Sequence, residues 1–228
     1  MFKKSYDIYM KQLIVFLISI FLCWEPAAAA EGLMHRPGEW NIGVGLKTST
    51  PGLGTDWGEF NVLNYTTGVE HDAKPGITSG GFDIQILYFL TEWLAGGLSF
   101  GDEYFDYDVA SGVNMDVDTR VNNFLVLVRI FLNPSQKYKW YIPLAVGLGH
   151  VMTGIDMQPE ESFHYTGFSG HIGLGLERLL NKHWSLAAEL RYNHNQFHNT
   201  QTNARGENYR VYPKLNYFSL SVRTDYRF

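Results

Sequence analysis

Charged residues alternate with small and apolar residues in several segments of this 228-residue chain. The last ten residues, SLSVRTDYRF, place Arg223, Asp225 and Arg227 at every second position. The full set of such charges comprises Asp83, Arg129, His171, Glu177, Glu189, Arg191, Arg223 and Asp225. An unpaired charge is very costly to bury, so we expect these side chains to pair in one interior, with the C-terminal charges opposite Glu177 and Glu189. Such a network could be a structural plug, a gated ion path or a small binding pocket.

The segment RYNHNQFHN, residues 191–199, could carry a second kind of chemistry. Its imidazole rings, those of His194 and His198, could bind a metal ion. The alternative interpretation is a plain loop with surface histidines. His194 and His198 lack the spacing of a ligand-rich metal site, so we predict no metal and no cofactor.

The segment GDEYFDYDVASGVNMDVD, residues 101–118, gathers acidic residues that could hold Ca²⁺ through their oxygens. The acidic residues are Asp102, Glu103, Asp106, Asp108, Asp116 and Asp118. The helix-loop-helix calcium site requires glycine at its sixth position and glutamate at its twelfth. Counted from Asp106, neither residue is present at its position. We therefore expect a solvated acidic loop, which could bridge divalent cations to phosphate groups.

Alternation with period two dominates the chain after its first thirty residues, and it predicts an all-β fold. The expected strands are Trp40–Lys47, Gly81–Phe89, Trp93–Gly101, Val121–Leu132, Trp140–His150, Phe168–Leu179, Trp184–Asn193 and Leu215–Phe228. Short turns at Leu90–Glu92, Asn133–Lys139 and Leu180–His183 alternate with four long polar connections. Short turns at one end and long loops at the other are typical of an up-and-down outer-membrane barrel of eight strands.

The two faces of these strands favour a membrane barrel over a soluble one. One face is apolar, whereas the other combines glycine and alanine with paired charges, which suits a narrow polar lumen. Aromatic residues mark both expected membrane interfaces. They are Tyr88, Phe89, Trp93, Phe131, Trp140, Trp184, Tyr226 and Phe228 at the short-turn end, and Phe163, Tyr165, Phe168, Tyr192, Phe197 and Tyr209 at the other. An eight-stranded barrel is normally filled by side chains, so the plug is the favoured interpretation of the charges.

The first thirty residues read as a secretory signal. Basic residues precede an apolar run from Leu13 to Trp24, and Pro26 and four alanines follow it. We expect cleavage after Ala30, which leaves residues 31–228 as the barrel domain; an N-terminal membrane anchor is the alternative. Net charge is −5, so the chain lacks the basic surface of a nucleic-acid partner.

The alternating strands, the segments ELRYNH and SVRTDYRF and the terminal phenylalanine resemble the OmpA-like, OmpX-like and opacity-type outer-membrane barrels. This resemblance implies an outer-membrane location, and it makes Phe228, with Tyr226, a signal read by the barrel-assembly machinery. Members of this group serve in adhesion, structural support, permeation and catalysis. We expect a monomer with a structural or surface-interaction role, surrounded by lipid and lipopolysaccharide, whose loops could bind an extracellular ligand.

Residues 191–199 also resemble, more weakly, the His-x-Ser-Asn stretch of outer-membrane lipid A deacylases. In this resemblance His194 matches the catalytic base, and Glu207 could be the acid that orients its ring. His194 also shares the lipid-facing parity of Leu190 and Tyr192. Gln196 occupies the position of the nucleophile, and its amide cannot be acylated as serine can. We therefore predict no enzyme activity, with a deacylase-like esterase and a small pore as the alternatives.

Overall fold

The computed structural model describes residues 34–51, 60–64, 69–109, 116–155, 161–202, 208–211 and 214–228. These residues form ten strands and short connections. The strands are β1 (Trp40–Pro51), β2 (Phe60–Asn64), β3 (Val69–Phe89), β4 (Leu94–Val109), β5 (Asp116–Phe131), β6 (Tyr138–Ile155), β7 (Glu161–Leu179), β8 (Trp184–Thr202), β9 (Asn208–Val211) and β10 (Lys214–Arg227). No helix in the described segments is long and apolar enough to cross a membrane.

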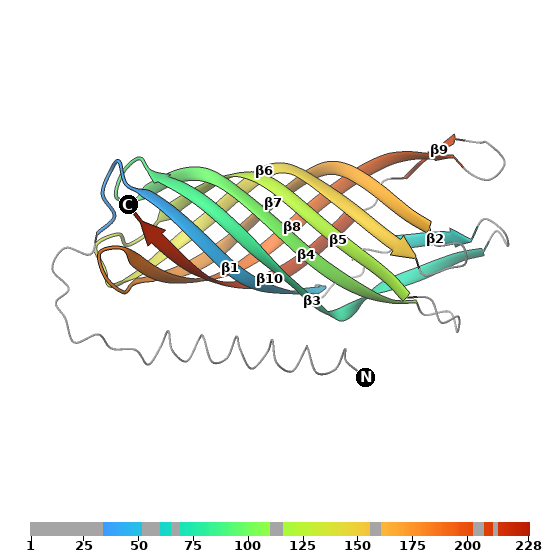
Figure 1. Cartoon of the computed structure of the whole chain (residues 1–228), viewed down its shortest axis with the longest axis horizontal. Coiled ribbons are helices and arrows are strands. Elements are labelled where there is room, and N and C mark those ends of the chain that lie inside the picture. The colour runs from blue at the N-terminus through green and yellow to red at the C-terminus, as the bar shows by residue number, and fades with distance from the viewer. Residues whose placement is uncertain are drawn as a thin grey trace.

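Eight of the strands close into an antiparallel barrel (Figure 1). Each long strand pairs with its neighbours in the chain, and β1 closes the ring by pairing with both β3 and β10. Val44, for example, lies opposite Ile84 on one side and Thr224 on the other. The short strands β2 and β9 extend β3 and β8 at the end of the barrel away from the C-terminus. The predicted eight-stranded up-and-down barrel is thus confirmed. The predicted signal at residues 1–30 lies outside the described residues.

The strands are longer than the sequence predicted at the end opposite the short turns. The turns between Phe89 and Leu94, Phe131 and Tyr138, and Leu179 and Trp184 lie where we expected them. At the other end, β4 continues to Val109 and β8 to Thr202, several residues beyond the predicted ends. The apolar alternation stops where the lipid-facing band stops, but backbone pairing with neighbouring strands continues beyond it. Part of the expected acidic loop is therefore strand.

The pleat separates two very different faces. On β5, Phe124 is 56 % exposed on the outside, whereas its neighbour Leu125 is 4 % exposed in the interior. The same alternation recurs around the barrel, so the outside carries a continuous apolar band and the interior carries most of the charge. Such an arrangement, apolar outside and polar inside, suits a barrel surrounded by lipid.

The aromatic residues at the strand ends are divided between the two faces. Trp40 packs on Tyr88 and Trp184 packs on Tyr226, with ring centroids 5.0 and 4.9 Å apart, in the outer wall at the short-turn end. Four residues predicted for the interfacial girdles are instead buried in the lumen, namely Phe89, Phe131, Tyr165 and Phe197. Their position in the sequence is correct for a girdle, but the pleat turns them inward, and they narrow both ends of the lumen.

Candidate functional site

A charge-balanced layer crosses the middle of the lumen; we call it the central network. It consists of Arg129, Arg191, Arg223, Asp83, Glu189 and Asp225, three guanidinium groups and three carboxylates. These residues come from β3, β5, β8 and β10, and none is more than 3 % exposed. Because opposite charges meet inside a space that excludes most solvent, their pairing offsets the cost of burying them.

Glu189 is the hub of the central network. Its Oε1 accepts hydrogen bonds from Arg223 at 2.6 Å and from the Tyr141 hydroxyl at 2.6 Å, and it lies 3.4 Å from Arg129. Its Oε2 accepts a hydrogen bond from Arg191 Nε at 2.5 Å. One carboxylate therefore contacts all three arginines, so its loss would leave excess positive charge in the lumen.

The other two carboxylates each bind one arginine, Asp83 binding Arg191 and Asp225 binding Arg223. Asp83 Oδ2 lies 3.1 Å from Arg191 Nη2, and Oδ1 accepts a hydrogen bond from Ser221 at 3.0 Å. Asp225 Oδ1 accepts a hydrogen bond from Arg223 Nε at 2.5 Å. Gln85 links the two halves, since it donates to Asp83 at 2.6 Å and accepts from Arg129. The network is therefore continuous from β3 to β10.

Two glycines make room for these large side chains. A Cβ at Gly43 would lie 1.8 Å from Asp225 Oδ1, and one at Gly175 would lie 2.2 Å from the Tyr141 ring. Both positions face the lumen, where β1 and β7 pass close to the network. The small residues beside the charges in the sequence thus provide the space that the charged side chains fill.

A second ion pair lies farther toward the end with β2 and β9. Lys47 Nζ lies 2.7 Å from Glu103 Oε1, and neither side chain is more than 5 % exposed. The Ser49 hydroxyl donates to the same carboxylate oxygen at 3.3 Å. Nearby, the Ser169 hydroxyl lies 2.9 and 2.5 Å from the amide oxygens of Asn123 and Asn195, and its one hydrogen can be donated to either of them. Polar contacts therefore continue beyond the central network.

The segment before β1 fills the opposite mouth of the lumen. His35 is fully buried, its Nε2 lies 3.0 Å from Glu177 Oε2, and its ring stacks on Phe89 with centroids 4.0 Å apart. Backbone hydrogen bonds from Gly38 N to Phe89 O and from Phe89 N to Glu39 O hold the segment in place at 2.8 and 2.9 Å. We call residues 34–39 the mouth segment.

Replacing His35 with alanine is expected to lower the free energy of unfolding by about 2 kcal/mol, because a stacked ring is lost and the Glu177 carboxylate loses its buried partner. Urea titration of the folded barrel in phospholipid bilayers would measure this. Arg36→Ala, which removes an exposed side chain from the same segment, is the control and should change little. Equal effects of the two substitutions would mean that His35 does not fasten the mouth segment.

The structure divides the charged residues predicted from sequence into three groups. Six of the eight form the central network. His171 is buried in the same lumen, but its Nε2 has no hydrogen-bond partner in the described part of the chain. Glu177 lies nearer the short-turn end, where it meets His35 rather than the expected C-terminal arginines. Arg227 is 3.5 Å from Glu39 and donates to the Met34 carbonyl oxygen at 3.4 Å, so it also holds the mouth segment.

The other predicted residues lie on the outside or at the strand ends. His194 is on the outer wall, where its Nδ1 lies 2.7 Å from Asn216 Oδ1. Glu207 lies outside the described residues. Tyr226 packs edge-on against Phe228 with ring centroids 5.1 Å apart, and the Phe228 backbone N donates to Trp40 O at 3.0 Å.

The sequence analysis missed several members of the interior. Tyr141 and Lys47 lie on predicted strands with lumen parity, but we did not single them out. Glu103 was assigned to a solvated loop, and His35 precedes every predicted strand. Ser99 and Gly101 have the parity of the lumen face, and Glu103 lies two residues farther along the chain. The same alternation, continued beyond the predicted end of the strand, would have placed Glu103 inside. No pattern in the sequence points to His35, because it is not part of a strand.

Comparison with known proteins agrees with this architecture. Residues 14–228 match the family model of the outer membrane protein beta-barrel domain. OprG from Pseudomonas aeruginosa has a similar structure, with a TM-score of 0.58 and 15 % identity over 86 % of this chain and 98 % of that one. Outer membrane protein W of E. coli gives a TM-score of 0.53 and 15 % identity over 86 % of this chain and 100 % of that one. At these identities the likeness concerns the fold.

A comparison with curated protein sequences finds no match. The family match nevertheless covers nearly the whole chain, and the closed barrel, the apolar outer band and the polar lumen agree with it. The chain therefore belongs to the outer membrane β-barrel domain family, and its location is the outer membrane.

Proposed function

We propose that this protein is a structural, surface-presenting barrel whose lumen is sealed. The observation that carries this proposal is the central network, in which three arginines and three carboxylates bridge the lumen and none is more than 3 % exposed. Short turns face the periplasm in outer-membrane barrels, so the mouth segment forms a second seal on the periplasmic side. The barrel then acts as an anchor for the connections at its outer end, which are the expected contact with extracellular ligands.

Charge balance is the reason that the network seals rather than conducts. Where charged side chains line a selective ion path, they form rings of one sign along a continuous opening. Here each arginine has a carboxylate oxygen within 3.4 Å, and Gln85, Ser221 and Tyr141 add hydrogen bonds to the network. A passing ion would have to break several buried ion pairs. Liposomes that contain the folded protein should therefore swell in small sugars no faster than empty liposomes, and faster swelling would argue for a pore.

We also infer that the barrel is not an esterase. The partner of His194 is the Asn216 amide oxygen, and an amide offers no nucleophile for acyl transfer. Gln196, two residues along the strand, is likewise an amide. Mass spectra of lipid A from cells with and without the protein should be identical, and loss of an acyl chain on expression would overturn this inference.

Replacing Phe228 with alanine is expected to reduce the amount of folded barrel that reaches the outer membrane. We propose that Phe228 and Tyr226 form the signal for the assembly machinery, because Phe228 is 65 % exposed and its ring contacts Tyr226 on the outside of the barrel rather than the lumen. The variant refolded from urea should therefore be as stable as the wild type. Trp93→Ala, which removes another exposed aromatic from the same end, is the control. Normal assembly of the Phe228 variant, measured by heat-modifiable migration of outer-membrane fractions, would contradict this role.

A further inference from the structure

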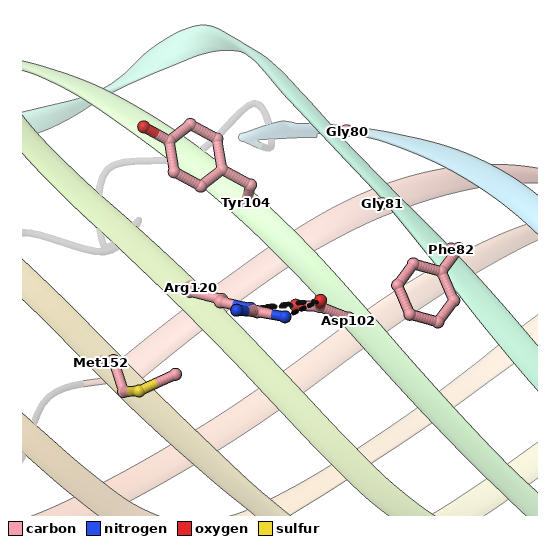
Figure 2. A pocket seen from close by; sticks show the side chains of 7 residues that line it. All are labelled: Gly80, Gly81, Phe82, Asp102, Tyr104, Arg120 and Met152. Atoms are coloured by element: carbon pink, nitrogen blue, oxygen red, sulfur yellow. Dashed lines mark hydrogen bonds and ion pairs between the residues drawn. The ribbon is translucent and has the colours of Figure 1, made fainter.

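A hollow of about 370 Å³ lies in the outer wall of the barrel, separate from the lumen (Figure 2). Its walls come from four adjacent strands, β3 to β6. The lining residues are Gly80, Gly81, Phe82, Asp102, Tyr104, Arg120 and Met152. Gly80 on β3 lies opposite Tyr104 on β4 and carries no side chain to fill the space beside it, so the wall is recessed at this point.

The hollow lies where the apolar band ends. Phe82 and Phe100 pack together with ring centroids 6.2 Å apart at the edge of the band away from the short turns, and both face outward. Asp102 and Tyr104 continue the same face of β4 toward the outer end, away from the short turns. A molecule in the hollow would therefore contact apolar side chains on one side and charged groups on the other, as a lipid headgroup does.

An ion pair forms the polar side. Arg120 donates to Asp102 Oδ1 from Nε at 2.9 Å and to Oδ2 from Nη2 at 2.6 Å. The side chain of Asp102 is only 12 % exposed, whereas that of Arg120 is 54 % exposed. In the described part of the chain Nη1 of Arg120 has no hydrogen-bond partner. The carboxylate therefore orients the guanidinium group while one nitrogen stays available for an outside anion.

We propose that this hollow binds the phosphorylated glycolipid of the outer leaflet, with a lipid A phosphate on Arg120. Guanidinium groups bind phosphate through directed, charge-assisted hydrogen bonds. An acyl chain would follow Phe82 along the apolar band, and the recess beside Gly80 and Tyr104 would take the sugar. The volume of the hollow exceeds that of a phosphate alone, which favours a sugar phosphate over a free ion. In the orientation proposed above, with the short turns in the periplasm, the hollow lies on the side of the outer leaflet, in which this glycolipid resides.

The test measures binding of bisphosphorylated lipid A to the folded protein in detergent micelles. Arg120→Gln is expected to weaken binding about tenfold, the effect of losing one charge-assisted hydrogen bond. Asp102→Asn keeps an oxygen that can accept a hydrogen bond from Arg120 but removes the negative charge beside the phosphate, so this variant should bind at least as tightly as the wild type. Lys182→Gln is the control, because it removes one exposed positive charge at the opposite end of the barrel. Heat-modifiable migration verifies that each variant is folded.

Competing ligands distinguish the sources of phosphate. Dephosphorylated lipid A should bind the wild type as weakly as intact lipid A binds the Arg120 variant. Inorganic phosphate and phosphatidylglycerol at equal concentration should not displace lipid A. The proposal is overturned if all variants bind lipid A equally, or if Lys182→Gln weakens binding as much as Arg120→Gln. Displacement by phosphatidylglycerol or inorganic phosphate would show that the hollow recognises phosphate without regard to the glycolipid, and would likewise overturn it.

Discussion

Replacing Glu189 with glutamine is expected to lower the free energy of unfolding of the barrel by ~3–5 kcal/mol. Glu189 contacts Arg129, Arg191 and Arg223, so its neutralisation leaves three arginines with two carboxylates inside the lumen. A buried charge without a partner is far more costly than the pair it came from. Urea titration in phospholipid bilayers, with tryptophan fluorescence as the readout, would measure the loss.

The control for this substitution is Glu92→Gln in the exposed turn after β3. It removes the same charge from the chain but leaves the lumen unchanged, so its stability should equal that of the wild type. Arg191→Gln, by contrast, should resemble Glu189→Gln, because Arg191 joins Glu189 to Asp83. Equal stability of the Glu189 variant and the wild type would show that the lumen is hydrated enough to hold unpaired charge, and the central network would then not be a seal.

Replacing Lys47 with methionine is the second large expected effect. The Glu103 carboxylate, 2.7 Å from Lys47 Nζ and 1 % exposed, would lose its only ion-pair partner among the described residues. We expect unfolding to become easier by ~3–5 kcal/mol. The double variant with methionine at both positions should regain most of that stability, because two apolar side chains of similar size replace a buried pair at little cost.

A double-mutant cycle measures this coupling directly. Additive losses in the cycle, with the double variant less stable than either single variant, would contradict a buried, mutually dependent pair. The same cycle on Arg120 and Asp102 gives a useful contrast. Arg120 is half exposed, so solvent screens that pair and its coupling should be much smaller.

The sequence predicts the barrel well because one rule applies throughout. Period-two alternation identified all eight barrel strands, and the positions of the short turns followed from where it stops. It also assigned Asp83, Glu189 and Arg223 to the interior. However, the alternation arises because one face of each strand contacts lipid, so it can no longer be recognised where the strands extend beyond the apolar band. Glu103 was therefore taken for a loop residue, although the strand and its parity continue through it.

The partners of the interior charges could not be read in the same way. Which carboxylate meets which arginine depends on the stagger of the strands around the closed barrel, and alternation within one strand contains no information about stagger. Glu177 was expected near the C-terminal arginines, but it lies at the short-turn end of the lumen, beside the mouth segment. Its actual partner, His35, belongs to a segment without periodicity, which is positioned only by contacts with the finished barrel.

Conductance of the folded protein in planar lipid bilayers tests the sealed lumen most directly. The recording uses the chain with residues 34–39 present, with a wide-channel porin in the same membranes as the positive control. The charge-balanced network and the mouth segment predict that the current stays at the level of the bare bilayer, although the barrel is recovered folded from the membrane. Regular, reproducible opening steps that follow the amount of inserted protein would contradict it.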